Sequence, residues 1–300
     1  MKKFLLLFAT ALMLAACGQK DDKKQEQPEK KEVSVPQGVP VAPIQQIQVP
    51  EKDGTDPSAL GSSNGPVLSL EEGQPLDFSQ LMGGRKSFQD QVIEHLDIIV
   101  AQAKEGKAEY EYLYGLCYEN GWGVEQNPKQ AFSWYSKSAE QDYAAACNSL
   151  GNLYRMGSGV TANANKALEW YRKGAKGGDG QAMLNLGNCY FYGMGVKKDE
   201  KTAVKWWTDA AEAGNAFAMS QMGDCYYFGI GVEKDLKKAI EYYQPAADKN
   251  ISNAQFRLGI LYYTGNGVQQ DQTYAKLLMQ KARDGGMPEA KEFLDRNFKN

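Results

Sequence analysis

Few side chains in this chain could take part in catalysis or metal binding, and the scarcity of histidine limits that chemistry most. His95 is the only histidine, so a Ser-His-Asp triad or a histidine-rich metal site has almost nothing to be built from. Residues 61–65 match the Gly-x-Ser-x-Gly pattern of a hydrolase nucleophile, but that pattern has meaning only between a strand and a helix. Here it lies in a proline-rich polar stretch. The sequence therefore predicts a protein that is not an enzyme and that holds no metal ion and no cofactor.

The cysteines are the other reactive side chains, and their spacing indicates packing. Cys117, Cys189 and Cys225 share one position of an internal repetition, which leucine holds in the other two repeats. Cys147 holds a position that methionine takes twice. Positions shared with leucine and methionine predict small buried hydrophobic side chains. We therefore expect these four thiols to be free.

The repetition has a step of 36 residues and fills the C-terminal two-thirds of the chain. Glycine, tyrosine and a Gly-x-Gly-Val turn recur at this step without an insertion. The series are Gly115, Gly151, Gly187, Gly223 and Gly259; Tyr118, Tyr154, Tyr190, Tyr226 and Tyr262; and turns from Gly121, Gly157, Gly193, Gly229 and Gly265. A fixed period in this range predicts stacked supersecondary units.

Each repeat is predicted to be an antiparallel pair of helices. In the second repeat, apolar residues at i, i+4, i+7 and i+8 from Ala146 form one face of a helix, which the turn at Gly157 ends. The second helix then needs an N-cap, and the same position always holds a strong capping residue: Asn127, Asn163, Asp199, Asp235 and Asp271. One face of the second helix carries Ala167, Trp170, Tyr171 and Ala175.

Glycine inside the first helices costs about 1 kcal/mol relative to alanine, so Gly151 and its equivalents need a shared reason. We attribute them to close approach of the two helices of a pair, beside the small Ala167. The position of Trp170 is predicted to wedge between neighbouring pairs. Extending the period outward predicts half-repeat caps at both ends of the stack. These are one helix at residues 88–104, with His95 at the small position, and one at 289–298.

The repeated residues resemble the Sel-one-like repeat (SLR) family, which is related to the tetratricopeptide repeats. The resemblance covers residues 108–286. It is nearly complete in the third repeat, at Leu186, Gly187, Tyr190, Gly193, Gly195, Val196, Asp199, Ala203, Trp206, Ala210, Ala211 and Gly214. The fifth repeat departs from the pattern at Leu278, Met279 and Arg283. The resemblance implies an all-α fold: a right-handed α-solenoid of about five antiparallel helix pairs that works as an interaction scaffold.

The N-terminal 86 residues are predicted to be an export signal and a tether. Residues 1–16 combine a basic start, a short apolar run and small residues, as a signal peptide does. The ending Leu-Ala-Ala-Cys resembles the bacterial lipobox, which implies lipidation of Cys17; a plain secretory signal is the alternative. Gly18 in place of aspartate then implies the outer membrane, facing the periplasm. Residues 17–86 are predicted to be a disordered tether and residues 87–300 the solenoid.

The face of the first helices opposite the core is the candidate binding surface, because it lines the concave groove in tetratricopeptide-like stacks. It mixes aromatic, amide and charged side chains, as protein interfaces do. The candidate groove residues are Tyr112, Glu119, Asn148, Asn152, Arg155, Asn188, Phe191, Asp224, Tyr227, Phe256 and Tyr263. Packing between repeats is the alternative for Phe191, Tyr227 and Tyr263. The amides and Asp224 have less structural reason to be there.

The function predicted from the sequence is that of an envelope lipoprotein acting as a protein-protein interaction scaffold, with an unidentified protein or peptide in the groove. One alternative is an immunity-type protein that neutralises a periplasmic toxin. A second is a hydrolase acting on peptidoglycan or β-lactams. The resemblance implies the β-lactam activity only through a few cysteine-rich SLR proteins, whose paired cysteines this chain lacks. With 34 Lys and Arg against 37 Asp and Glu, the chain offers no basic stripe for nucleic acid.

Overall fold

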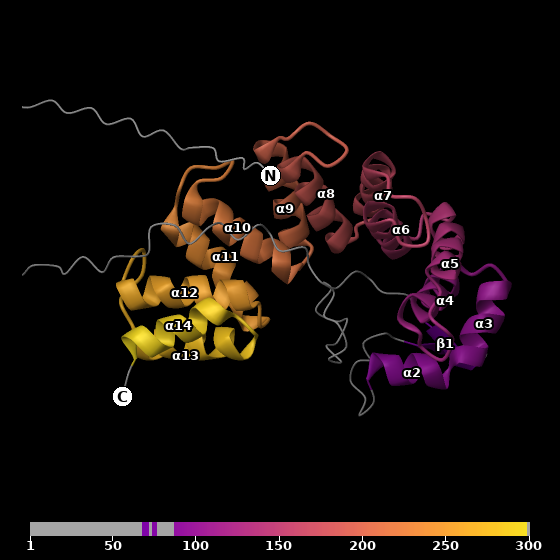
Figure 1. Ribbon diagram of the computed structural model, residues 1–300, viewed down its shortest axis with the longest axis horizontal. Helices are drawn as coiled ribbons and strands as arrows, with labels where there is room; N and C mark the ends of the chain where they lie inside the picture. The colour runs from indigo at the N-terminus through magenta and orange to yellow at the C-terminus, as the bar shows by residue number, and fades with distance from the viewer. Residues whose placement is uncertain (1–67, 72–73, 77–86, 299–300) are drawn as a thin grey trace, which may run out of the picture. The chain divides into compact units, whose positions relative to one another are not determined.

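The computed structural model of the chain describes residues 68–71, 74–76 and 87–298 (Figure 1). The predicted signal peptide, Cys17 and most of the predicted tether lie outside the described residues. Within the described part of that tether, β1 (Leu68–Glu71) pairs antiparallel with β2 (Gln74–Leu76). The remaining described residues form helices joined by short turns.

Five helix pairs make up the repeat region, as predicted. Figure 1 shows them following one another along the chain, from magenta to yellow. The first helices are α4 (Ala108–Asn120), α6 (Ala144–Met156), α8 (Gly180–Tyr192), α10 (Ala216–Phe228) and α12 (Ser252–Thr264). The second helices are α5 (Pro128–Glu140), α7 (Ala164–Lys176), α9 (Glu200–Glu212), α11 (Leu236–Asp248) and α13 (Gln272–Asp284). Every helix packs against its pair partner, and every second helix packs against the first helix that follows it.

The turn between the two helices depends on both of its glycines. Gly157 ends α6 in the left-handed region, at φ 74°, and Gly159 follows at φ 71°. A side chain on Gly159 would collide with the carbonyl of Pro128, in the first turn of α5. The missing side chain therefore lets each turn contact the pair before it. The N-caps are also confirmed: the Asn163 side chain, for example, accepts a hydrogen bond from the Lys166 amide at 3.0 Å.

The interior glycines have a different cause from the predicted one. An added Cβ on Gly151 would lie 2.6 Å from the ring of Tyr171, and one on Gly187 would lie 2.5 Å from Trp207. The glycine therefore makes room for a large side chain of the second helix. The equivalent side chains are all buried: Tyr135, Tyr171, Trp207, Tyr243 and Met279. The residues predicted to wedge between pairs stand one position earlier, and four of them, Trp134, Trp170, Trp206 and Tyr242, are only half-buried.

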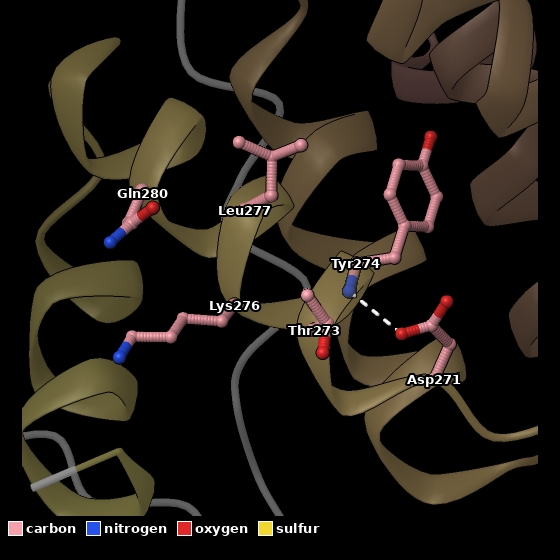
Figure 2. A pocket seen from close by; sticks show the side chains of 6 residues that line it. All are labelled: Asp271, Thr273, Tyr274, Lys276, Leu277 and Gln280. Carbon is pink, nitrogen blue, oxygen red and sulfur yellow. Dashed lines mark hydrogen bonds between the residues drawn. The ribbon is translucent and has the colours of Figure 1, made fainter.

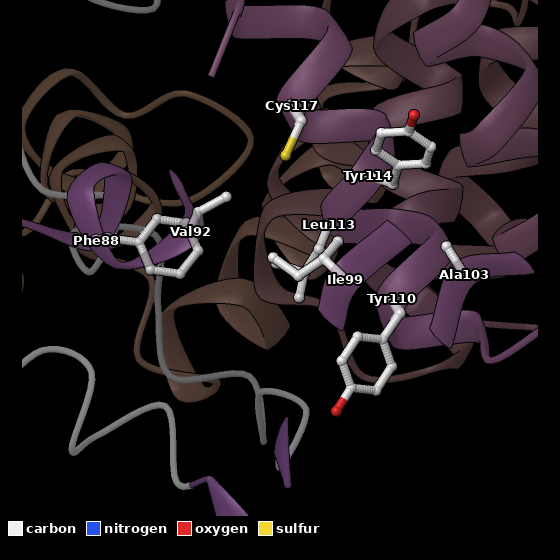
Figure 3. Packing of buried hydrophobic residues seen from close by; sticks show 8 residues of the cluster. All are labelled: Phe88, Val92, Ile99, Ala103, Tyr110, Leu113, Tyr114 and Cys117. Atoms are coloured by element: carbon white, nitrogen blue, oxygen red, sulfur yellow. The ribbon is translucent and has the colours of Figure 1, made fainter. Parts of the chain in front are cut away.

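Helices outside the five pairs close both ends of the stack. The predicted helix at residues 88–104 is in fact two helices, α2 (Phe88–Glu94) and α3 (Leu96–Lys104), which separate at His95. The His95 ring nitrogen Nδ1 lies 2.8 Å from the Gln91 carbonyl oxygen, a structural contact. Figure 3 shows the core that these helices share with α4, including Val92 and Ile99. At the other end, α14 (Pro288–Asn297) buries Ala290 against α12 and α13, as predicted.

The cysteine prediction is confirmed for the described part of the chain. Cys117, Cys147, Cys189 and Cys225 are free and buried. Burial raises the pKa of each thiol, to about 12 for Cys117 and Cys225. Low-pKa thiolates are the reactive form of cysteine, so these thiols are packing groups.

Candidate functional site

The candidate groove residues all lie on the first helices, but none of them is exposed. Asn148 and Phe256 are buried, at 9% and 4% exposure. The other nine are half-buried: Tyr112, Glu119, Asn152, Arg155, Asn188, Phe191, Asp224, Tyr227 and Tyr263. We call this set the groove face. Its assignment as a binding surface stays a prediction.

The polar residues of the groove face have structural partners that the sequence did not reveal. The Tyr171 hydroxyl donates to Asn152 Oδ1 at 2.8 Å. In the next repeat, Trp207 Nε1 donates to Asn188 Oδ1 at 3.2 Å. In the fourth, the Tyr243 hydroxyl donates to an Asp224 carboxylate oxygen; in the first, the Tyr135 hydroxyl donates to Glu119. These acceptors satisfy the polar atom of each buried ring, which a buried Tyr or Trp requires.

The exceptions to this pairing follow the same logic. The fifth repeat has Met279 in place of the ring, and Ile260 in place of the acceptor, so neither side has a polar atom to satisfy. The first repeat has Leu116 at the acceptor position, and there Glu119, one turn later, takes over. The expectation that the amides and Asp224 have less structural reason to be on this face is therefore wrong.

Further amides of the first helices tie successive repeats together. Asn185 Nδ2 in α8 donates to Asn148 Oδ1 in α6 at 2.8 Å. Asn253 Nδ2 in α12 donates to Ser220 Oγ and to Asp224 Oδ2 in α10, both at 3.0 Å. These bonds join first helix to first helix, so they fix the spacing of the pairs on this face.

The aromatic residues of the groove face also pack within the stack. The Phe191 ring lies 5.3 Å from that of Trp207, and the Tyr263 ring lies 5.1 Å from that of Phe293. Tyr112 contacts two rings at once, those of Tyr135 and Tyr143. The Tyr227 ring lies 6.5 Å from that of Tyr243. Packing was the alternative left open for Phe191, Tyr227 and Tyr263, and the structure shows packing contacts for all three.

A buried ion pair lies at the junction of α10 and α12. Arg257 Nε lies 3.7 Å from Asp224 Oδ1, and the Arg257 side chain is 9% exposed. Arg257 Nε is buried and has no hydrogen-bond partner among the described residues. The guanidinium lies 5.0 Å from the ring centre of Phe228. Burial raises the pKa of Asp224. The hydrogen bond from Tyr243 and the charge of Arg257 lower it, but the effect of burial is larger.

The sequence reasoning missed an exposed row of apolar residues at the ends of the first helices. Met156, Tyr192 and Phe228 are the last residues of α6, α8 and α10, and they are 53%, 43% and 37% exposed. They occupy one repeat position, held by Asn120 and Thr264 in the outer repeats. We call these three residues the apolar stripe. The sequence could have shown this row, because its three residues directly precede the first glycine of a turn, at Gly157, Gly193 and Gly229.

Basic side chains lie beside the apolar stripe. Lys198 Nζ is 5.2 Å from the ring centre of Phe191, whose ring also contacts Tyr192. Lys234 Nζ is 5.9 Å from the ring centre of Tyr227. These cation-aromatic contacts place two lysines next to exposed apolar surface, and Lys198 is also ion-paired with Glu200 at 2.9 Å.

The rest of the described chain offers little room for chemistry. A hollow of about 430 Å³ lies along α13, and Figure 2 shows its lining residues, including Tyr274 and Leu277. All of them come from this helix and its N-cap Asp271, whose side chain accepts a hydrogen bond from the Tyr274 amide. The described residues contain no group of three or more His, Cys, Asp or Glu placed to hold a metal ion. None of their helices is long and apolar enough to cross a membrane.

The fold and the repeating contacts define a class: a tetratricopeptide-like α-solenoid built from equivalent helix pairs. The chain belongs to the Sel1 repeat family, whose repeat matches residues 108–143, 144–179, 180–215, 216–251 and 252–287. No curated protein matches the chain.

Solved structures agree with this assignment. A Sel1 repeat protein from Oxalobacter formigenes is 32% identical, with a TM-score of 0.62, over 67% of this chain and 88% of that one. The protective antigen c5321 of uropathogenic Escherichia coli is 30% identical with the same TM-score; this chain covers 48% of its length, and 74% of this chain is matched. The immunity protein Pa5087 of Pseudomonas aeruginosa is 22% identical over 66% of this chain and 75% of that one, with a TM-score of 0.47. That likeness is too weak to bear on function.

Proposed function

We propose that this protein is an envelope lipoprotein that acts as an interaction scaffold and is not an enzyme. A partner protein or peptide binds along the first helices, on the side that carries the groove face. The single observation that supports this is the apolar stripe, which continues through three successive repeats at 37–53% exposure. Large apolar side chains that stay exposed at the same position of successive repeats offer a partner apolar surface to cover. Nucleic acid is no partner, since the chain carries a net charge of −3.

Affinity capture from envelope extracts tests the proposal. The full chain should retain a partner that is lost when Met156, Tyr192 and Phe228 are all replaced by serine, while the helix content stays unchanged. Leu277→Ser is the matched control, because Leu277 is 44% exposed but lies on α13. Retention of the same partner by the triple variant would refute binding at this surface. Asn152, Asn188 and Asp224 are unsuitable targets, because they bind the buried rings.

The captured partner separates the alternatives. A periplasmic toxin would favour the immunity-type function, and hydrolysis of peptidoglycan or a β-lactam by the purified protein would favour an enzyme.

The lipid anchor at Cys17 and the outer-membrane location are part of the same proposal. They are supported by the signal-like residues 1–16 and the lipobox-like Leu-Ala-Ala-Cys. Two or more acyl chains hold a protein on a membrane stably. Cys17→Ser should therefore move the protein from the membrane fraction to the soluble fraction of the envelope. If the variant stays in the membrane fraction, the anchor is not at this residue.

A further inference from the structure

We infer that Asn266, in the last Gly-x-Gly-Val turn of the stack, is a site of spontaneous deamidation through a succinimide. The modification needs no partner, so the inference is independent of the proposed function. It depends on three observations: the Asn-Gly pair at residues 266–267, the hydrogen bonding of the two reacting groups, and the contacts that hold the turn against α11.

The first observation is the dipeptide, which sets the chemistry. The backbone nitrogen of Gly267 loses its proton to solvent and attacks Cγ of the Asn266 side chain. A C–N bond forms, the Cγ–Nδ2 bond breaks, and Nδ2 takes a proton from solvent and leaves as ammonia. Water then opens the resulting succinimide at one of its two carbonyls, which leaves aspartate or isoaspartate at residue 266. Glycine favours the attack, because no side chain hinders its nitrogen and its backbone adopts the widest range of angles.

The second observation is the freedom of the two reacting groups. Asn266 and Gly267 are both exposed. Within the described part of the chain, the Gly267 amide donates no hydrogen bond and the Asn266 side chain makes none. The backbone amide of Asn266 donates to the Leu261 carbonyl at 3.2 Å, but that nitrogen takes no part in the reaction. The Gly267 nitrogen can therefore approach Cγ without giving up a hydrogen bond.

Asn120 supplies the comparison, because it also precedes a glycine and is also exposed. It is the last residue of α4, and its Nδ2 donates to the Leu116 carbonyl at 3.0 Å. The Gly121 amide, which would be the nucleophile, donates to the Cys117 carbonyl. Attack at Asn120 therefore requires the end of the helix to open and both hydrogen bonds to break. We expect Asn120 to react about tenfold more slowly than Asn266, or slower still.

The third observation is the close packing of the turn. A Cβ on Gly267 would lie 2.9 Å from Leu236 Cβ, so the Gly267 backbone lies against the first residue of α11. Val268 packs against the same hydrophobic cluster as Leu236 and Ile240. Isoaspartate adds a methylene group to the main chain between residues 266 and 267, and a close-packed contact has no room for it. Isoaspartate here should therefore loosen the junction between the fourth and fifth repeats.

Ageing of the full chain in warm, mildly alkaline buffer tests the inference, with peptide mapping by mass spectrometry as the measurement. Aspartate and isoaspartate should accumulate at residue 266 at least about tenfold faster than at residue 120. Mapping separates both from the third Asn-Gly pair, residues 64–65, which lies outside the described residues. Incubation in urea is the matched control, because unfolding removes the hydrogen bonds at Asn120 and should bring the two rates together. Equal rates in the folded chain, or a tenfold difference that persists in urea, would overturn the inference.

Two variants locate the reactivity in the turn itself. Asn266→Ser removes the site and copies the residue that the second repeat holds at this position, Ser158. Conversely, Ser158→Asn should create a reactive site, because the Gly159 amide likewise donates no hydrogen bond within the described residues. If residue 158 of this variant is as inert as Asn120, the turn does not determine the reactivity and the inference is wrong.

Urea unfolding of the aged protein checks the structural consequence. The fraction that carries isoaspartate at residue 266 should unfold at a lower urea concentration than the fresh chain. Asn266→Ser, aged for the same time, should keep the urea midpoint of its fresh sample. An isoaspartate fraction as stable as the fresh chain would contradict the inference that this turn holds the last two repeats together.

Discussion

At the scale of single residues, the structure assigns one polar side chain of the first helix to the buried ring in each of four repeats. A tyrosine hydroxyl or indole nitrogen that is buried needs an acceptor, and Asn152, Asn188 and Asp224 supply one in three consecutive repeats. These side chains were the most persuasive binding candidates in the sequence. Their regular spacing was the clue to the opposite interpretation, because a partner does not need to repeat every 36 residues but a core contact does.

Asp179 gives the clearest prediction at this scale. It is the N-cap of α8, it is 7% exposed, and burial raises its pKa from an ordinary 3.8 to about 6. Folding therefore favours the protonated carboxyl group, so this residue adds stability at low pH that is lost as the pH rises from about 4 to about 6. A shift of this size corresponds to up to about 3 kcal/mol.

Urea unfolding between pH 4 and 7 checks this prediction. The stability of the natural chain relative to Asp179→Asn should fall as the pH rises through this range and then level off. Asparagine is the matched replacement, because Asn215 occupies the same repeat position and caps α10 through its side-chain oxygen. Asn215→Asp should introduce a second slope of the same sign. A pH-independent difference between the natural chain and Asp179→Asn would contradict the assignment.

At the scale of helices, the sequence predicted the elements well but not the contacts between them. The 36-residue step located both helices of each repeat, the N-caps and the glycine turns, because these features are local. Trp170 and Tyr171 are neighbours in sequence and both fit the inner face of the second helix. Which of them covers Gly151 depends on the angle at which the two helices of the pair pack, and no local sequence pattern specifies that angle. The break at His95 in the first capping helix was likewise not predicted, because no glycine or proline marks it in the sequence.

The glycine-ring contact predicts that a usually favourable substitution is harmful here. Gly187→Ala should gain about 1 kcal/mol of helix propensity, but its Cβ would lie 2.5 Å from Trp207, deep in the pair. Overpacking of this kind costs about 1–3 kcal/mol, so we expect a net loss in chemical denaturation. Gly259→Ala is the control. Its Cβ meets the flexible end of Met279 at 2.9 Å, so it should be close to neutral. Equal effects of the two substitutions would refute the contact as the reason for the glycine.

At the scale of the whole molecule, the extensive contacts of each helix pair are those with the pairs before and after it, and the same helices meet at each junction. The stability of such a stack is a sum over repeats and the interfaces between them. The hydrogen bonds that cross between first helices follow this rule, since Asn185 reaches back one repeat to Asn148 and Asn253 reaches back one repeat to Ser220.

This architecture predicts that one whole repeat can be removed. Deleting residues 180–215 brings α7 against α10 through the same repeat positions, with Gln221 taking the place of Asn185. The shortened chain should keep its helix content per residue in circular dichroism and unfold cooperatively at lower stability. Deleting residues 180–197 removes α8 but leaves α9 without its pair partner, and should destroy that cooperativity. If both deletions behave alike, the repeat is not the structural unit. The whole-repeat deletion also removes Tyr192, so it should weaken binding at the apolar stripe while the fold survives.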